Sequence, residues 1–279
     1  MWILITGGGG QLGRALATML SEHELTVTTR ETLDITKRDE VFSTVSHARP
    51  EVLIHCAAYT NVDDCAQDPA LAYQVNGLGT QNVALACQAF NVAMVHISTN
   101  EVFAGTSREG YEEWMPLSPG NAYGRSKAAA ERHVQNILSR FYIVRTAWLY
   151  APGGRNFIHA ILNRARSSSQ LRVVTDEIGN PTYVQDLAAA IAKLIPTQQY
   201  GIYHFVNSGA CSRWHFANEI LRLAGLEQVV NRPILSKEFK RPSTPPPYGK
   251  LHNIAGAAIG ITLRPWQEAL QDYMQTDTV

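Results

Sequence analysis

Short apolar runs alternate with segments of helical character through the first half of the chain. The runs Trp2–Thr6 and Val52–His55 are mostly apolar, as expected of strands that are covered on both faces. The segments between such runs have the length and composition of helices. Strands that alternate with helices predict right-handed βαβ crossovers and a doubly wound parallel sheet. The expected strands are 2–6, 25–28, 52–55, 92–98 and 142–145, and the expected helices are 11–21, 39–48, 69–90 and 121–139.

The pattern changes after Tyr150. Later segments mix an expected helix (214–224), an expected strand (202–206) and a cluster of prolines at 242 and 245–247. We therefore predict an α/β fold in which a Rossmann-type sheet domain is followed by a smaller, mixed domain. The expected division gives 1–150 to the sheet domain and most of 151–279 to the smaller domain, with part of 183–206 returning to the sheet.

The composition excludes several classes of protein. The 279 residues include 24 Lys and Arg against 24 Asp and Glu, so the formal net charge is zero. A chain without a basic excess does not bind nucleic acid or an anionic membrane through bulk electrostatics. No apolar stretch is long enough to span a membrane. We expect no nucleic-acid partner, no membrane partner, and a protein that works as a monomer or a homodimer.

The spacing of cysteines and histidines adds two expectations. The four cysteines form no Cys-x-x-Cys pair, and the nine histidines show no spacing typical of a metal site. A reducing compartment is therefore expected, and a disulfide framework is not. We predict a cytoplasmic protein without a catalytic metal.

A glycine-rich turn follows the first expected strand and opens the first expected helix. Gly7, Gly10 and Gly13 have the spacing of a variant dinucleotide-binding fingerprint. Gly7 permits the tight turn, Gly10 lets the backbone approach a pyrophosphate, and Gly13 lets the helix lie close to the strand. The N–H groups at the helix N-terminus would then bind the phosphates. The alternative is a tight turn that binds nothing.

The end of the second expected strand bears on the choice of cofactor. NAD-selective sites usually carry an acid about 20 residues after the glycines, where it binds the ribose hydroxyls. Here the strand ends with Thr28-Thr29-Arg30 and offers no acid. The guanidinium of Arg30 can hold a 2′-phosphate, which favours NADPH and leaves NADH open. Alternatively, Arg30 is a solvated surface residue.

Tyr123 and Lys127 lie four residues apart on one face of an expected helix. Thr99 follows the fourth expected strand, at the edge of a doubly wound sheet where ligands bind. A phenol there can protonate the oxygen of a ketone that receives a hydride, and a hydroxyl can hold that oxygen. We expect Lys127 to lower the pKa of Tyr123, because an ammonium ~4 Å away contributes about 4 kcal/mol at an effective dielectric near ~20. The alternative is a Tyr123 ring packed in the core and a solvated Lys127.

With these motifs the chain resembles the dTDP-4-dehydrorhamnose reductase family of the extended short-chain dehydrogenases/reductases. The resemblance covers nearly the whole chain. Its more specific parts are Arg145-Thr146-Ala147-Trp148, Gly179-Asn180-Pro181-Thr182 and Arg264-Pro265-Trp266. The other matching segments are 6–13, 33–36, 55–63, 75–76, 97–99, 123–127, 186–188 and 241–242.

The resemblance implies a place for each of several residues. Tyr123 and Lys127 would combine catalysis with contacts to the ribose of the cofactor, and Thr99, Asn100 and Trp148 would lie on the substrate side. Trp148 could alternatively pack in the core at the end of a strand. On the cofactor side, the resemblance places Gly10, Gln11 and Leu12 along the pyrophosphate, Asp34 and Ile35 at the adenine, and Ala57, Ala58 and Tyr59 near the ribose and nicotinamide.

Two stretches depart from the family pattern. Family members usually read Ser-Thr-Asp-Tyr-Val-Phe where this chain has Ser-Thr-Asn-Glu-Val-Phe at 98–103. Asn100 keeps the hydrogen bonding but removes a charge beside Tyr123. Glu101 restores an acid one position along, although it would point to the opposite side if the strand continued. The stretch 245–249 also differs, so the identity of the sugar nucleotide stays open.

The leading interpretation is an NAD(P)H-dependent reductase of a nucleotide-linked 4-keto sugar, most simply of dTDP-4-dehydro-L-rhamnose to dTDP-L-rhamnose. The smaller domain would bind this substrate. A nucleotide-sugar epimerase is an alternative, because epimerases share the Tyr-Lys pair. A second alternative is a non-catalytic, NADP-binding regulatory subunit that resembles the beta subunit of methionine adenosyltransferase. The presence of Thr99, Tyr123 and Lys127 together favours catalysis.

Overall fold

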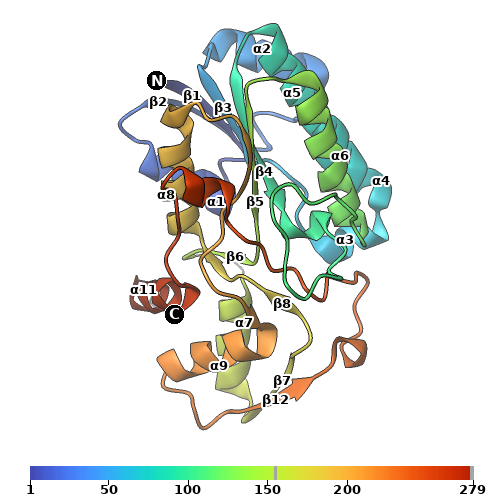
Figure 1. Cartoon of the computed structure of the whole chain (residues 1–279), viewed down its shortest axis with the longest axis vertical. Coiled ribbons are helices and arrows are strands. Elements are labelled where there is room, and N and C mark those ends of the chain that lie inside the picture. The colour runs from blue at the N-terminus through green and yellow to red at the C-terminus, as the bar shows by residue number, and fades with distance from the viewer. Residues whose placement is uncertain (154–155, 277–279) are drawn as a thin grey trace.

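The structure is a computed structural model that describes residues 1–153 and 156–276. Its centre is a six-stranded parallel sheet in the order β10-β5-β4-β3-β1-β2 (Figure 1). The chain starts in the interior of the sheet and builds it outward in both directions, which is the doubly wound arrangement that the sequence predicts. The strands are β1 (Trp2–Thr6), β2 (Glu24–Thr28), β3 (Val52–His55), β4 (Ala93–Thr99), β5 (Phe141–Thr146) and β10 (Gly201–His204).

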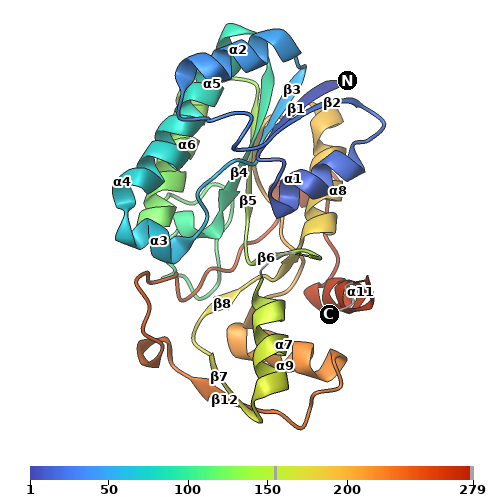
Figure 2. The ribbon, with the colours of Figure 1, turned by 180° about the vertical axis from the view of Figure 1, so that it is seen from behind.

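Helices cover both faces of this sheet (Figures 1 and 2). Successive strand residues point to opposite faces, so Ile3 and Ile5 belong to one hydrophobic core and Leu4 to another. The first core also contains α1 (Gln11–Met19) and α8 (Val184–Leu194). On the opposite face, the second core contains α2 (Arg38–Ala48), α5 (Thr80–Ala89) and α6 (Ala122–Ile137).

The expected helix 69–90 is interrupted by a wider turn. After α4 (Pro69–Ala72), the stretch Tyr73–Gly79 is π-helical, and α5 follows it. Asn76 is fully buried in this stretch, where its Oδ1 accepts a hydrogen bond from the Tyr59 N–H at 2.7 Å. Its Nδ2 donates to the Ser126 hydroxyl on α6 at 2.9 Å. The π-helical turn thus ties the loop after β3 to α6.

Much of the second half of the chain forms a lower lobe beyond the carboxyl ends of the strands (Figure 2). Its strands are short, and its interior is aromatic: the Tyr150 ring contacts those of Tyr183, Phe216 and Tyr273. The elements of this half include β6 (Leu149–Tyr150), α7 (Phe157–Ser167), β7 (Gln170–Val174), β8 (Ile178–Gly179), β9 (Thr182–Tyr183), β11 (Cys211–Ser212), α9 (Arg213–Leu223), β12 (Val230–Ile234), α10 (Ala255–Ala258) and α11 (Trp266–Thr276).

Part of the second half returns to the sheet. β10 pairs in parallel with β5, where Gly201 lies opposite Tyr142, and α8 packs on α1. The expected second domain, 151–279, includes residues 154, 155 and 277–279, which lie outside the described ranges. The boundary at residue 150 stays a prediction.

The expected proline cluster forms a strap that runs back from the lower lobe towards the sheet (Figure 1). We call residues 241–249 the proline-rich strap. The Tyr248 N–H donates to the Gly105 carbonyl at 3.2 Å, and the Gly249 N–H donates to the Ile178 carbonyl at 2.7 Å. The strap is therefore fixed at its end to both halves of the molecule.

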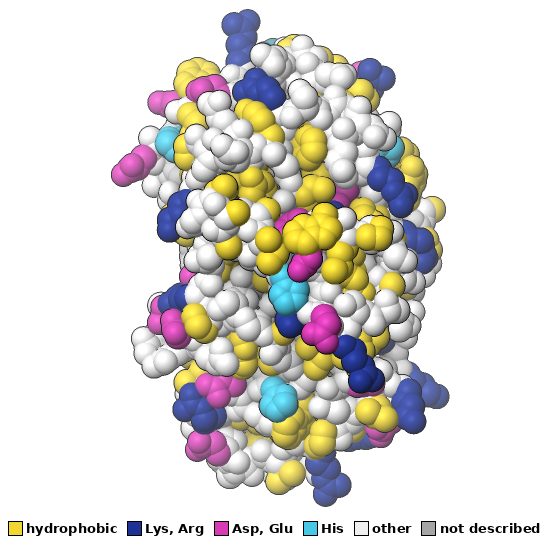
Figure 3. All heavy atoms as spheres, in the orientation of Figure 1, with side chains coloured by type: hydrophobic (Ala, Val, Ile, Leu, Met, Phe, Trp, Pro, Cys, Tyr) yellow, Lys and Arg dark blue, Asp and Glu magenta, His cyan; other side chains and the backbone are white. Residues whose placement is uncertain are grey.

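The surface shows mixed charge. Figure 3 shows Lys and Arg side chains spread around the margin of the face it draws, with Asp and Glu among them. Within the ranges that the structure describes, no helix combines the length and the apolar character that a membrane crossing needs.

Candidate active site

A cavity of about 1020 Å³ lies at the carboxyl ends of β1, β3 and β4. This is the edge at which ligands bind in doubly wound sheets, and the volume is at the upper end of the range typical of ligand pockets. The cavity brings together every residue that the sequence analysis singled out as a site residue. These residues are Gly7, Gly10, Gln11, Leu12, Arg30, Asp34, Ile35, Ala57, Ala58, Tyr59, Thr99, Asn100, Tyr123, Lys127 and Trp148.

The glycine turn is shaped by close backbone contacts. Gly7 has a φ of 72°, and a Cβ there would lie 2.5 Å from the Ala57 backbone nitrogen. A Cβ at Gly13 would lie 2.4 Å from the Gly7 carbonyl oxygen, so only glycine lets α1 approach the turn so closely. Gly10 is the N-cap of α1 and brings no side chain to its N-terminal N–H groups. Backbone, rather than side chains, therefore forms this part of the cavity wall.

Arg30 and Asp34 lie at the same end of the cavity. Arg30 is exposed and its side chain borders the cavity. The Asp34 carboxylate accepts hydrogen bonds from the Thr36 hydroxyl at 2.7 Å and the Thr36 N–H at 3.0 Å. These bonds lower the pKa of Asp34, with a smaller contribution from the positive charges nearby.

Lys127 is buried, which excludes the reading of a solvated lysine. Its side chain lies on α6 and is 2% exposed. The Nζ donates to the Ile97 carbonyl at 2.6 Å and lies 3.3 Å from Nε2 of His96. Burial lowers the pKa of Lys127 to about 8, and the carboxylate of Glu131 opposes this shift. The ammonium is thus held at the cavity wall by β4.

Tyr123 lines the cavity one helical turn before Lys127, and its pKa moves in the direction opposite to our expectation. Burial raises the pKa of the phenol, the charge of Glu101 raises it further, and a hydrogen bond with Thr99 opposes them. Lys127 is not among the groups that shift it, and its ammonium donates to the Ile97 carbonyl. The expected lowering of this pKa by Lys127 is therefore wrong for this structure. Tyr123 is a phenol that keeps its proton.

The two departures from the family pattern meet in space. Asn100 Nδ2 donates to the carbonyl of Gly249, at the end of the proline-rich strap, at 3.1 Å. A Cβ at Gly249 would lie 2.3 Å from this nitrogen, so the contact also requires glycine. Asn100 Oδ1 accepts a hydrogen bond from the Thr99 hydroxyl at 3.3 Å. Because a carboxylate cannot donate to a carbonyl, Asn100 makes a bond to the strap that an aspartate could not make.

Glu101 also lines the cavity, in contrast to what strand alternation suggested. β4 ends at Thr99, and residues Asn100–Val102 form a 3₁₀ turn, so the two-residue alternation no longer applies. Asn121 Nδ2 donates to Glu101 Oε2 at 2.6 Å. Burial raises the pKa of Glu101, and this hydrogen bond opposes the shift. An acid therefore borders the cavity beside Tyr123.

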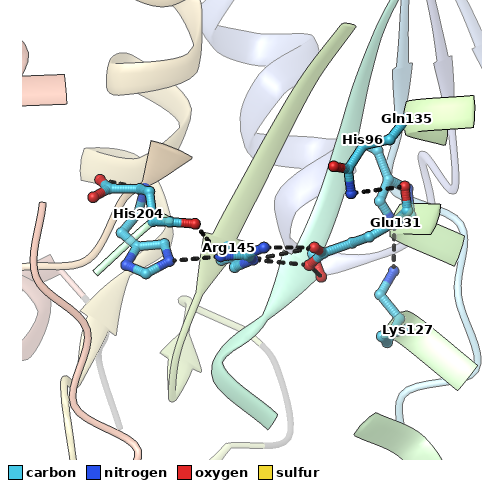
Figure 4. Close-up of polar contacts among 8 residues, drawn as sticks. His96, Lys127, Glu131, Gln135, Arg145 and His204 are labelled. Atoms are coloured by element: carbon cyan, nitrogen blue, oxygen red, sulfur yellow. Dashed lines mark hydrogen bonds and ion pairs between the residues drawn. The ribbon is translucent and has the colours of Figure 1, made fainter. Parts of the chain in front are cut away.

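A buried polar network continues from this wall through the sheet (Figure 4). Arg145 on β5 forms an ion pair with Glu131 on α6 at 2.7 Å, and both side chains are almost completely buried. Ser98 Oγ donates to Glu131 at 2.5 Å, and Arg145 Nη1 donates to the Glu113 carbonyl at 3.0 Å. On the far side of Arg145, its Nη1 lies 3.2 Å from Nε2 of His204 (Figure 4). The network fixes α6, and with it Lys127, relative to the sheet.

Trp148 borders the substrate end of the cavity in an unusual backbone conformation, with a φ of 44°. Its side chain is half-buried and also packs against two hydrophobic cores. Trp148 therefore both lines the cavity, as a substrate contact would, and packs in the core at the end of a strand. Arg213, which the sequence analysis missed, lies with its Cζ 3.6 Å from the centroid of the Trp148 ring. Its sequence context, Cys211-Ser212-Arg213, contains no motif that could have indicated this contact.

A doubly wound parallel sheet with a glycine turn at its carboxyl edge defines a Rossmann-type dinucleotide-binding protein. The family model described as RmlD substrate binding domain matches residues 1–279. The chain belongs to the dTDP-4-dehydrorhamnose reductase family, as its motifs predict.

Several relatives match over almost their whole length. Spore coat polysaccharide biosynthesis protein SpsK of Bacillus subtilis (strain 168) is 38% identical, with 98% of this chain and 96% of that protein covered. The dTDP-4-dehydrorhamnose reductase of Streptomyces griseus is 39% identical, with 96% and 91% covered. Among solved structures, dTDP-4-dehydrorhamnose reductase from Bacillus anthracis str. Ames in complex with NADP superimposes with a TM-score of 0.95, at 38% identity and 98% coverage of both chains.

Proposed function

We propose that this chain is an NADPH-dependent reductase of a nucleotide-linked 4-keto sugar, and that it converts dTDP-4-dehydro-L-rhamnose to dTDP-L-rhamnose. The observation that carries the proposal is the shared cavity, in which a glycine turn opens into the same space as Thr99, Tyr123 and Lys127. The names of the relatives support the substrate class, and the NADP complex of the Bacillus anthracis enzyme supports the cofactor.

The residues at the glycine turn fit a dinucleotide. Because Gly10, the N-cap of α1, lines the cavity and carries no side chain, a pyrophosphate can approach the N–H groups that open α1. Arg30, exposed at the cavity, would bind the 2′-phosphate that distinguishes NADPH from NADH. When bound, NADPH supplies the hydride that the carbonyl carbon accepts. We place its pyrophosphate at Gly10, Gln11 and Leu12, beside the tight turn that Gly7 permits. We place its adenine at Asp34 and Ile35, and its ribose and nicotinamide near Ala57, Ala58 and Tyr59.

The proton comes from Tyr123 in this proposal. Burial and the charge of Glu101 keep the phenol protonated, which is the form that can donate. As the carbonyl oxygen gains negative charge, Tyr123 Oη gives it a proton and an O–H bond forms. Solvent then returns the proton to the phenolate. We place the Lys127 ammonium at the ribose of the cofactor. The Thr99 hydroxyl would hold the carbonyl oxygen during this transfer.

The lower lobe is the proposed binding domain for the nucleotide sugar. Trp148 lies where this lobe meets the sheet, and we place the sugar ring against its indole. Asn100 would orient Thr99 on the substrate side, because its Oδ1 accepts a hydrogen bond from the Thr99 hydroxyl. We further propose that the enzyme works in the cytoplasm as a monomer or homodimer; its four free cysteines agree with a reducing compartment.

The test is to follow NADPH oxidation against a panel of nucleotide-linked 4-keto sugars with the wild type and Tyr123→Phe. We expect the wild type to be most active on dTDP-4-dehydro-L-rhamnose. Tyr123→Phe should lose about 10²- to 10⁴-fold in kcat, because it removes only the proton donor. Its affinity for NADPH, measured by fluorescence titration, should stay unchanged. Tyr73→Phe, which removes a phenol on the outer surface, is the matched control and should keep full activity.

The same assay separates the alternatives. A regulatory subunit would bind NADPH and oxidise it with none of the sugars. An epimerase would convert a nucleotide sugar without net consumption of NADPH. Either result, or full activity in Tyr123→Phe, would contradict the proposal.

A further inference from the structure

An arginine that the proposed chemistry does not use lies flat on Trp148 at the substrate end of the cavity. Arg213 is the first residue of α9, and its guanidinium lies between the rings of Trp148 and Phe157, with Cζ 3.6 Å and 5.2 Å from their centroids. The Trp148 ring packs closely on Gly179, where a Cβ would lie 2.6 Å from its Cε2. Stacking of this kind holds the planar guanidinium in one orientation.

The hydrogen-bond donors of Arg213 are largely unused. Its Nε lies 3.7 Å from Oε2 of Glu177, which is an ion pair but is beyond hydrogen-bond distance. Over the ranges that the structure describes, we find no hydrogen bond from the guanidinium of Arg213 to another residue. The side chain is only 22% exposed, and burial lowers its pKa to about 10. A guanidinium that is largely withdrawn from water is more stable when an acceptor meets these donors.

The other charged groups at this end already have partners. Lys127 donates to the Ile97 carbonyl, and Arg241 forms an ion pair with Asp63 at 2.9 Å. Glu101 accepts from Asn121, and burial raises its pKa, which favours its neutral form and weakens its repulsion of an anion. Glu177 approaches Arg213 from the Nε side and leaves the two Nη groups for another acceptor.

We propose that Arg213 binds the diphosphate of the nucleotide sugar. Its two Nη groups form a planar fork that matches two phosphate oxygens, and a diphosphate is present in every substrate of the proposed class. Trp148 would then separate two subsites, with the sugar on the side of Thr99 and Tyr123 and the diphosphate at Arg213. This inference depends on the proposed function for the identity of the ligand.

The test measures binding directly and needs no turnover. Titration calorimetry compares dTDP and thymidine as ligands for the wild type, Arg213→Met and Arg213→Lys. We expect Arg213→Met to bind dTDP at least about 10-fold more weakly, because two charge-assisted hydrogen bonds are lost, and to bind thymidine and NADPH unchanged. Arg213→Lys should lie between them, since it keeps the charge but not the fork. Arg172→Met, which removes an exposed arginine of the same lobe, is the control and should bind dTDP like the wild type.

Three results would overturn the inference. The first is a wild type that does not bind dTDP. The second is an Arg213→Met variant with unchanged dTDP affinity, even if its KM for the sugar substrate rises, since the contact would then be with the sugar. The third is an equal loss of dTDP and thymidine binding in Arg213→Met, because the loss would then not depend on the diphosphate. The double variant Glu177→Gln/Arg213→Met must show the same equal loss. It removes the Glu177 carboxylate, which loses its partner in Arg213→Met and could disturb the fold.

Failure of the proposed function gives a different result. A wild type that binds dTDP through Arg213 and reduces no 4-keto sugar would reject the reductase and keep the diphosphate site. A wild type that reduces the sugar, while Arg213→Met binds dTDP normally, would keep the reductase and reject the site.

Discussion

At the scale of single residues, burial acts on Tyr123 and Lys127 in the same sense. It raises the pKa of the phenol and lowers that of the ammonium, so the neutral form of each group is favoured. Tyr123 therefore holds its proton through the whole working range of pH. Lys127, with a pKa of about 8, is the one of the two that titrates within that range.

This difference predicts the pH dependence of the reaction. In the proposed mechanism Lys127 acts as an ammonium that holds the ribose of the cofactor, and its charged form is lost as the pH rises through about 8. We therefore expect kcat/KM to fall on the alkaline side with a limb near pH 8. In Lys127→Arg the side chain stays charged, because the guanidinium titrates above ~12, so the limb should disappear even though the rate is lower. The measurement is the steady-state rate from pH 6 to about 10. Of Tyr123 and Lys127, only Lys127 titrates in this range.

Glu101→Gln is the control for this assignment. Glu101 borders the cavity but is not among the groups that shift the pKa of Lys127, so the limb should stay in place. A limb that persists unchanged in Lys127→Arg would show that another group is responsible.

At the scale of elements, Asn121 connects three parts of the site. Its Oδ1 caps α6 by accepting from the Gly124 N–H at 2.8 Å. Its Nδ2 donates to Glu101 and to the carbonyl of Thr244 in the proline-rich strap, at 2.6 and 3.1 Å. Asn121 is therefore a positioning residue, which ties the N-terminus of the helix that carries Tyr123 to the strap.

Asn121→Asp separates these two roles. Aspartate caps a helix as well as asparagine does, but it places a second carboxylate oxygen against Glu101 and cannot donate to Thr244. We expect stability to fall by about 1–3 kcal/mol in urea unfolding and kcat/KM to fall about 10-fold, with NADPH affinity unchanged. Asn156→Asp makes the same change at the cap of α7, where it loses the bond from Asn156 Nδ2 to the Ala151 carbonyl, and should lower stability without lowering kcat. Equal kinetic losses in both variants would reduce Asn121 to a structural role.

The elements differ in how well the sequence predicts them. β1 and β3 have the predicted bounds, because strands buried on both faces are uninterrupted apolar runs. In the lower lobe, β6, β8, β9 and β11 have two residues each, too few for an alternation to be visible. The sequence analysis does not predict the helices α7, α8 and α11.

At the scale of the whole molecule, topology explains how much of the site could be predicted. The glycine turn, Thr99 and Tyr123 come from strand ends and a helix face, which a doubly wound sheet brings to one edge. The contact between Asn100 and Gly249 joins residues 149 positions apart, and no local pattern encodes it. The same holds for Arg213 on Trp148, which depends on how the lower lobe docks.

The buried pair Glu131–Arg145 links α6 to the sheet, and it gives a prediction about the stability of the whole fold. Removing one partner leaves a charge that is shielded from water, so Glu131→Gln or Arg145→Met should each lower the free energy of unfolding by about 3–5 kcal/mol. The double variant leaves no unpaired charge, so it should lose clearly less than the sum of the two single losses. Lys37→Met breaks the exposed pair with Glu40 and should leave the free energy of unfolding almost unchanged. Urea unfolding of the four variants and the wild type measures these differences. If the single losses simply add in the double variant, the two side chains act independently, and the link between the catalytic helix and the sheet lies elsewhere.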